Sequence, residues 1–101
     1  MSGWWVYILR CGDGTIYTGI TNRLAERVKA HDEGRGAKYT RGRRPVELAW
    51  RTRCKTRGAA LSLEHAIKRL TRGQKEELIA AAGPARKQMV KRLKAKAGGK
   101  K

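Results

Sequence analysis

The chain has 101 residues, of which 25 are Lys or Arg and 8 are Asp or Glu, so its formal net charge is +17. This length suffices for one domain with a modest core, and a charge of this size attracts polyanions, above all nucleic acid, with a ribosomal-type binding protein or a membrane-surface peptide as the alternatives. Because no apolar run reaches the roughly 20 residues that span a bilayer and no secretory signal is visible, we expect a cytoplasmic protein without a membrane role.

The first predicted element is a β-hairpin over residues 4–21. Residues 4–11, WWVYILRC, are apolar on both alternating faces, which is typical of a strand covered on both sides. GDG at 12–14 indicates the turn. A three-residue turn pairs Tyr7 with Gly19 and Leu9 with Tyr17, so that all four share one face and the space opposite the Tyr7 ring stays open. A two-residue turn would put the two tyrosines on opposite faces.

A helix is predicted to follow, with Asn22 as its N-cap and residues 23–31, RLAERVKAH, as its body. Two glycines at 34 and 36 end it. Leu24, Val28 and His31 form its apolar stripe, and Arg27 lies one turn before His31 at the margin of that stripe.

Residues 34–45, GRGAKYTRGRRP, are predicted to form a basic loop that binds nucleic acid. Its cations suit phosphate, and its tyrosine suits either stacking on an unpaired base or plain loop packing. The binding residues predicted here are Arg35, Lys38, Tyr39, Arg41, Arg43 and Arg44. Residues 46–54 then predict a strand that alternates cleanly, with Val46, Leu48, Trp50, Thr52 and Cys54 on one face.

Two further helices are predicted, over residues 59–70 and 74–82, and Gly83-Pro84 ends the second. Glu64 borders the apolar stripe of the first, where it either pairs with Lys68 or reaches a cleft. Residues 86–101 carry no acidic group and predict a frayed helix or a disordered arm along phosphates. We therefore divide the chain into a domain over 1–82 and a basic, flexible tail over 83–101.

These elements predict an α+β fold, in which a small three-stranded antiparallel sheet is flanked by helices in the order β-β-α-β-α-α. Cys11 and Cys54 belong to no CxxC motif and cannot complete a four-thiolate zinc site. In a chain without an export signal, reduced thiols in or near the core are expected.

Phenol, guanidinium, imidazole and carboxylate groups that converge beside such a sheet suit phosphodiester hydrolysis. Mg²⁺ needs only one or two protein carboxylates, since phosphate and water fill its other positions. The metal and an arginine stabilise charge on the phosphate, while a phenol or imidazole orients or deprotonates the attacking water. The candidate catalytic residues are Tyr7, Tyr17, Arg27, His31 and Glu64.

The motifs resemble a known family. Over about residues 4–80 the chain is similar to the GIY-YIG nuclease domain, especially to its small stand-alone bacterial members. The similarity lies in WVYIL, in YTG ten residues later, in a helix with an Arg-x-x-x-His motif and in a later helix with one glutamate. The resemblance implies a three-stranded antiparallel sheet flanked by helices, and cleavage of DNA with a divalent metal, usually Mg²⁺ and otherwise Mn²⁺.

The resemblance also implies a role for each matching residue. Tyr7 matches the base or water-orienting tyrosine of the first motif, and Tyr17 and Gly19 match the second motif. Arg27 matches the arginine that contacts phosphate, His31 a histidine that assists proton transfer, and Glu64 the metal ligand. The chain departs from the family at Trp5-Val6 in the first motif and Thr18 in the second, and it has Gln74 and Lys75 where some members carry an asparagine.

The resulting hypothesis is a metal-dependent endonuclease that hydrolyses phosphodiester bonds in DNA. It would be directed to structure or damage, as in DNA repair, with little sequence specificity, because no groove-reading helix is visible; RNA is an alternative substrate. The competing hypothesis is a non-catalytic nucleic-acid-binding protein or repair adaptor that retains the fold. The oligomeric state is left open.

Overall fold

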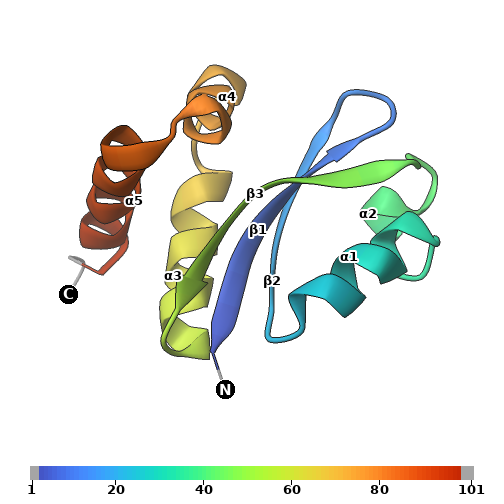
Figure 1. Ribbon diagram of the computed structural model, residues 1–101, viewed down its shortest axis with the longest axis horizontal. Coiled ribbons are helices and arrows are strands. Elements are labelled where there is room, and N and C mark those ends of the chain that lie inside the picture. The colour runs from blue at the N-terminus through green and yellow to red at the C-terminus, as the bar shows by residue number, and fades with distance from the viewer. Residues whose placement is uncertain (1–2, 99–101) are drawn as a thin grey trace.

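The computed structural model, which describes residues 3–98, is built on a three-stranded antiparallel sheet with the strand order β2-β1-β3 (Figure 1). The strands are β1 (Trp4–Cys11), β2 (Ile16–Thr21) and β3 (Val46–Cys54). The helices are α1 (Leu24–Asp32), α2 (Lys38–Arg41), α3 (Arg57–Lys68), α4 (Arg72–Ala80) and α5 (Gly83–Gly98). The predicted α+β class and sheet are confirmed.

The central strand β1 is covered on both faces, as its apolar composition predicts. Val6 and Ile8 pack in a core with residues of α3, α4 and α5. Tyr7 and Leu9 point the other way, into a smaller core with residues of α1. Figure 1 shows the two sets of helices on either side of the sheet. The protein therefore has two hydrophobic layers that share one strand.

The hairpin has the register of a three-residue turn. Tyr7 pairs with Gly19 and Leu9 pairs with Tyr17, and the turn is closed by Gly14, whose φ of 88° suits a residue without a side chain. Tyr7, Leu9 and Tyr17 lie in the same core cluster. The prediction that the two tyrosines share a face is confirmed.

The predicted alternation along β3 is wrong. Trp50 and Leu48 pair with consecutive residues of β1, so Ala49 is the extra residue of a β-bulge. A one-residue slip exchanges the two faces of a strand. Val46 consequently packs with Tyr7 and Leu9 in the smaller core beside α1, which we call the α1 layer. Trp50 and Cys54 pack in the larger core beside α3, α4 and α5, which we call the α3 layer.

Two helix boundaries also correct the sequence prediction. Helix α1 begins at Leu24 with Arg23 at the N-cap position and without a side-chain cap, so Asn22 is not the cap. Instead, the Thr21 hydroxyl accepts a hydrogen bond from the Arg23 N–H at 3.0 Å. The basic segment predicted as a loop contains a short helix, α2, at Lys38–Arg41.

The basic C-terminal segment forms helix α5 as far as Gly98. Val90 is only 9 % exposed and belongs to the α3 layer, and Met89 and Leu93 pack against the same cluster. Of the two predicted alternatives for this segment, the structure has the helix. Residues 99–101 lie outside the described residues, and the domain boundary at residue 82 and the flexibility of the tail stay predictions.

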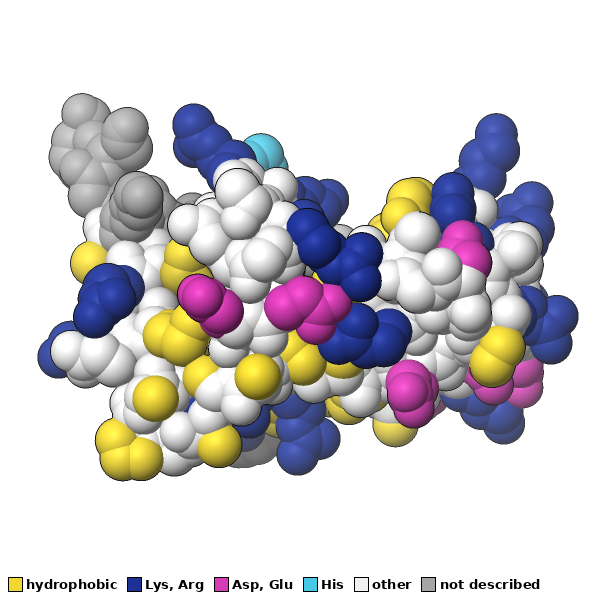
Figure 2. All heavy atoms as spheres, turned by 90° about the horizontal axis from the view of Figure 1, so that it is seen from above, with side chains coloured by type: hydrophobic (Ala, Val, Ile, Leu, Met, Phe, Trp, Pro, Cys, Tyr) yellow, Lys and Arg dark blue, Asp and Glu magenta, His cyan; other side chains and the backbone are white. Residues whose placement is uncertain are grey.

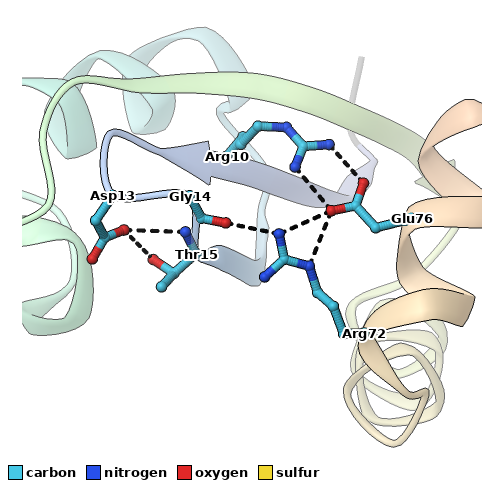
Figure 3. A network of polar contacts seen from close by, with 6 residues as sticks. All are labelled: Arg10, Asp13, Gly14, Thr15, Arg72 and Glu76. Carbon is cyan, nitrogen blue, oxygen red and sulfur yellow. Dashed lines mark hydrogen bonds and ion pairs between the residues drawn. The ribbon is translucent and has the colours of Figure 1, made fainter.

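An ion-pair network ties the hairpin to α4 (Figure 3). The Arg10 guanidinium donates to both carboxylate oxygens of Glu76, at 2.9 and 3.0 Å. Arg72 donates to Glu76 at 3.0 Å and to the Gly14 carbonyl in the turn at 2.8 Å. These two arginines hold the pKa of the Glu76 carboxyl at about 2. The network therefore links the tip of the β1–β2 hairpin to α4, on the face of the sheet that α3, α4 and α5 cover.

The charge of the protein is spread over its surface. Figure 2 shows Lys and Arg side chains projecting from many parts of one face, with acidic groups in a few places between them. Within residues 3–98, no helix is long and apolar enough to cross a bilayer. Cys11 and Cys54 are buried free thiols, as predicted.

Candidate active site

Three of the predicted catalytic side chains form one aromatic cluster beside the sheet. The ring centroids of Tyr7 and Tyr17 are 6.4 Å apart, and those of Tyr17 and His31 are 5.1 Å apart. The ring of Tyr39, 5.7 Å from that of Tyr17, extends the cluster to the surface. Strands β1 and β2 and helices α1 and α2 thus each contribute one ring, although their residues are distant in the chain.

Gly19 allows the Tyr7 ring to lie close against the neighbouring strand. A Cβ atom at position 19 would be 2.6 Å from the Tyr7 hydroxyl oxygen and 2.8 Å from Cζ. The expectation of open space opposite Tyr7 is therefore wrong, because the tyrosine fills that space with its own ring. Since β2 is an edge strand, the hydroxyl is carried towards the edge of the sheet.

His31 is fully buried and holds the Tyr7 hydroxyl from the other side. Its Nδ1 lies 2.7 Å from the Thr40 hydroxyl oxygen, and the Ala37 N–H approaches the same nitrogen at the longer distance of 3.3 Å. Because the Thr40 hydroxyl donates its one proton to the Ala37 carbonyl, the short bond to Thr40 requires a proton on Nδ1. The neutral ring then has a lone pair on Nε2, which lies 2.9 Å from the Tyr7 oxygen and accepts its hydroxyl proton.

Burial moves the pKa values of this pair in opposite directions. Burial, together with the positive charge of Arg27, lowers the pKa of His31 to about 4, so the imidazole is neutral at pH 7. Burial raises the pKa of Tyr7 to about 12, and the nearby Tyr17 and Glu64 add to this. Arg27 opposes the rise, through a hydrogen bond to the phenol and through its charge.

The residues that fix His31 were not predicted. The Thr40 hydroxyl is fully buried and also donates to the Ala37 carbonyl at 3.0 Å. A Cβ atom on Gly36 would lie 2.4 Å from His31 Nδ1, so only glycine allows the chain to pass this close. The signal available in the sequence was one threonine in a run of cations, which is too weak to distinguish a buried partner from a loop residue.

Arg27 and Glu64 approach the same phenol from different helices. Arg27 lies on α1, one turn before His31, and shifts the pKa values of both Tyr7 and His31. Glu64 lies on α3, which packs against both β1 and β2, and its charge reaches the Tyr7 hydroxyl. The structure thus gathers Tyr7, Tyr17 and His31 in one cluster, with Arg27 hydrogen-bonded to the phenol and Glu64 within electrostatic reach of it.

Glu64 also forms the predicted ion pair, with its Oε2 3.3 Å from Lys68 Nζ. Its side chain is nevertheless only 13 % exposed, whereas that of Lys68 is 53 % exposed. A half-exposed lysine is easily displaced, so the pair does not occupy the carboxylate permanently. Both readings of Glu64, as a helix pair and as a group at a cleft, are compatible with this geometry.

The donor set fits a hard divalent cation. No group of three or more His, Cys, Asp or Glu side chains in the described part of the chain is arranged to hold a metal by itself. Mg²⁺ does not require such a group, because one carboxylate together with substrate phosphate and water suffices. Glu64 is the carboxylate near the Tyr7 hydroxyl that would hold it.

The six residues predicted to bind nucleic acid fall into three groups. Arg35 pairs with Glu33, Arg43 pairs with Asp13 at 2.7 Å, and Arg44 donates to the Asp32 carbonyl at 2.6 Å. Lys38 and Arg41 are exposed and form no ion pair within residues 3–98. Tyr39 is 41 % exposed, with the Arg43 guanidinium 4.3 Å from the centre of its ring.

Comparison with known proteins places the chain among small single-domain relatives. A UPF0213 protein of Natronomonas pharaonis is 53 % identical over 76 residues, covering 75 % of this chain and 89 % of the relative. One of Clostridium perfringens is 52 % identical over 77 residues, covering 76 % and 83 %. The names of these relatives do not specify an activity.

A solved structure and a family model also match this chain. The solution NMR structure of a UPF0213 protein of Bacillus halodurans is 40 % identical, with a TM-score of 0.52, and covers 87 % of this chain and 94 % of that protein. Residues 3–77 match the model of the GIY-YIG catalytic domain, whose nucleases act on nucleic acid and are generally metal-dependent. On this evidence the chain belongs to the GIY-YIG family.

Proposed function

We propose that the protein is a metal-dependent endonuclease that hydrolyses phosphodiester bonds in DNA. The observation that carries this proposal is the Tyr7 hydroxyl, which is hydrogen-bonded at 2.9 Å to buried, neutral His31 and lies within the electrostatic reach of both Arg27 and Glu64. A phenol held between a neutral imidazole, a cation and a carboxylate is suited to proton transfer at a phosphate.

In this proposal the Tyr7 oxygen takes a proton from the attacking water while its own hydroxyl proton passes to the neutral His31 imidazole, 2.9 Å away. The water oxygen bonds to phosphorus, the bond from phosphorus to one ester oxygen breaks, and the departing oxygen takes up a proton from solvent. Arg27 stabilises the negative charge that develops on the Tyr7 oxygen. A divalent cation held by Glu64 would supply positive charge to the phosphate. Tyr17 packs against both Tyr7 and His31 and keeps them in place.

DNA with unpaired or distorted regions is the substrate class that we propose. Tyr39 offers an exposed ring backed by Arg43, and an aromatic ring of this kind stacks on unpaired bases irrespective of sequence. The exposed Lys38 and Arg41 flank it and suit phosphate contacts. Since the proposed nucleophile is water, the chemistry applies to RNA as well, and RNA belongs in the substrate panel.

The test is cleavage of labelled single-stranded, duplex, flap and branched DNA, and of RNA, with Mg²⁺ or Mn²⁺. We expect Tyr7→Phe and Glu64→Gln to lower the rate by about 10²- to 10⁴-fold, the range typical of general acid–base groups. Glu77→Gln is the matched control, because it removes the same charge from an exposed residue that forms no ion pair in the described part of the chain. The control should cut like the parent protein.

Equal cleavage by Tyr7→Phe, Glu64→Gln and Glu77→Gln would contradict the proposal. Binding of these nucleic acids without cleavage of any of them would favour the second candidate, a non-catalytic binding protein or repair adaptor. The net charge of +17 is the observation that favours this candidate, because charge alone gives sizeable, salt-sensitive affinity.

A further inference from the structure

We infer that the groove between β3 and α5 is a second binding site for the phosphate backbone of nucleic acid. The inference rests on the proposed function in one respect, since it extends the path of the same substrate. It concerns a different part of the molecule, because α5 begins at Gly83, beyond the residues 3–77 that match the family model.

The groove has a volume of about 570 Å³, and its polar lining is almost entirely basic. Thr52 of β3 forms one wall. One face of α5 forms the other and contributes Arg86, Lys87, Lys91 and Lys94 around Val90. No acidic side chain lines it.

Arg86 holds the two walls together. Its guanidinium lies 5.4 Å from the centre of the Trp50 ring and donates to the Arg51 carbonyl. Trp50 and Val90 are both buried in the α3 layer, so the backbones on either side of the groove are fixed to the core. The groove is therefore preformed rather than a gap between loosely attached elements.

The three lysines are available to a ligand. Lys87, Lys91 and Lys94 are exposed, and none of them forms an ion pair with the rest of residues 3–98. Lys87 and Lys91 are four residues apart on one helix, where like charges repel and destabilise the helix. An anion with several charges in a row would remove this repulsion, and a phosphodiester backbone supplies such a row.

A nucleic acid suits this groove better than an anionic membrane does. Peripheral helices that bind membranes combine basic residues with an apolar face that enters the lipid. In α5 the apolar residues Met89, Val90 and Leu93 face the core of the protein. The exposed surface of α5 is therefore charged and has no apolar face that could enter a lipid bilayer. Such a surface suits a nucleic-acid backbone, which is bound through its phosphates.

The test is the salt dependence of binding to a fluorescein-labelled 30-base-pair DNA duplex, measured by anisotropy between 50 and 200 mM KCl in EDTA, where metal-dependent cleavage does not occur. The groove variant carries Lys87→Gln, Lys91→Gln and Lys94→Gln. Its matched control carries Lys55→Gln, Arg69→Gln and Arg92→Gln, which remove equal charge from exposed positions outside the groove. Thermal unfolding checks that both variants are folded.

If three phosphates are bound by these lysines, the slope of log Kd against log salt should fall by up to about 2.7, since each contact contributes about 0.9. The loss of affinity between 50 and 200 mM salt then shrinks by about 40-fold in the groove variant. The control slope should change by less than about one contact's share. Equal changes in the two variants would overturn the inference, because the lysines would then act only through net charge.

Sedimentation with vesicles of phosphatidylserine and phosphatidylcholine tests the alternative partner. If the groove variant loses vesicle binding but keeps the parent's DNA slope, the groove is a membrane site and the inference is wrong. The proposed function can fail separately from this inference. If the salt slope depends on the groove lysines but the protein cuts no substrate, the nuclease proposal is refuted and the groove site stands. If the protein cuts DNA but the slope does not depend on the groove lysines, the groove inference is refuted and the nuclease proposal stands.

Discussion

Gly19 and His31 fix the Tyr7 hydroxyl from two directions. Gly19 leaves the surface of β2 without a side chain beneath the ring, and His31 places its Nε2 atom 2.9 Å from the oxygen. The phenol is 1 % exposed, so its orientation is set by packing instead of by solvent. The sequence predicted that both tyrosines share a face, because strand pairing fixes the faces once the turn length is known. It did not predict the ring position, which depends on a side-chain rotamer.

Replacement of Gly19 by alanine is expected to displace the Tyr7 ring. The new Cβ would lie 2.6 Å from the hydroxyl oxygen, so the ring must move away, at a cost of about 1–3 kcal/mol as in other overpacked cores. We expect a lower free energy of unfolding in urea and a cleavage rate lowered by at least tenfold, because a shift of about 1 Å at a reacting group can cost about 100-fold. Gly42→Ala is the control, since its Cβ meets nothing within 4 Å. Identical behaviour of the two variants would refute this assignment.

The buried imidazole predicts an acid-sensitive fold. The pKa of His31 is about 4 in the folded protein, against an ordinary value of 6.5. As pH falls from 6.5 to 4 the unfolded chain therefore binds a proton that the folded protein does not, and the free energy of unfolding falls by about 2–3 kcal/mol. Urea unfolding at pH 7 and pH 4.5 measures this difference. It should vanish in His31→Gln and persist in His65→Gln, which alters an exposed histidine; persistence in both variants would show that other groups are responsible.

At the scale of elements, two short pieces of structure support the site. Helix α2 presents Thr40 to His31, and the hairpin that carries both tyrosines is tied to α4 through Glu76. Helix α2 has four residues, too few to show any periodicity in a sequence. The bulge at Ala49 was equally hidden, because a regular strand explains the same run of alternating residues. The helices α1 and α3, which have clear apolar stripes, were predicted.

Removal of the carboxylate at Glu76 should loosen the hairpin turn. Arg10 and Arg72 would lose their common partner in Glu76→Gln, and Arg72 would hold the Gly14 carbonyl less firmly. Because these groups are partly exposed, the effect is expected to be local and to shrink at high salt. Hydrogen exchange of the Cys11 and Gly14 amides, which bond within the turn, should quicken several-fold while global unfolding changes little. Unchanged exchange, relative to the Glu77→Gln control, would show that the network does not hold the turn.

At the scale of the whole molecule, the fold was predictable because strand pairing, helix stripes and turn glycines agree with one another. The convergence of Tyr7, Arg27 and Glu64 was predicted from their places on the hairpin and helix faces, and the family resemblance added a role for each residue. The role of α5 in the core was missed for another reason. Its cations dominate its composition, and the burial of Val90 depends on the position of α3.

The two-layered construction has a consequence for when the protein becomes active. Tyr7, Tyr17, Arg27 and His31 all precede β3 in the chain, whereas Glu64 arrives with α3, from the opposite layer. A nascent or partly unfolded chain whose third helix has not yet docked would hold the proton-handling groups but lack the ligand for the cation. Under the proposed function, the protein would gain its ligand for the cation only when α3 has packed against the sheet, so that cleavage would depend on completed folding.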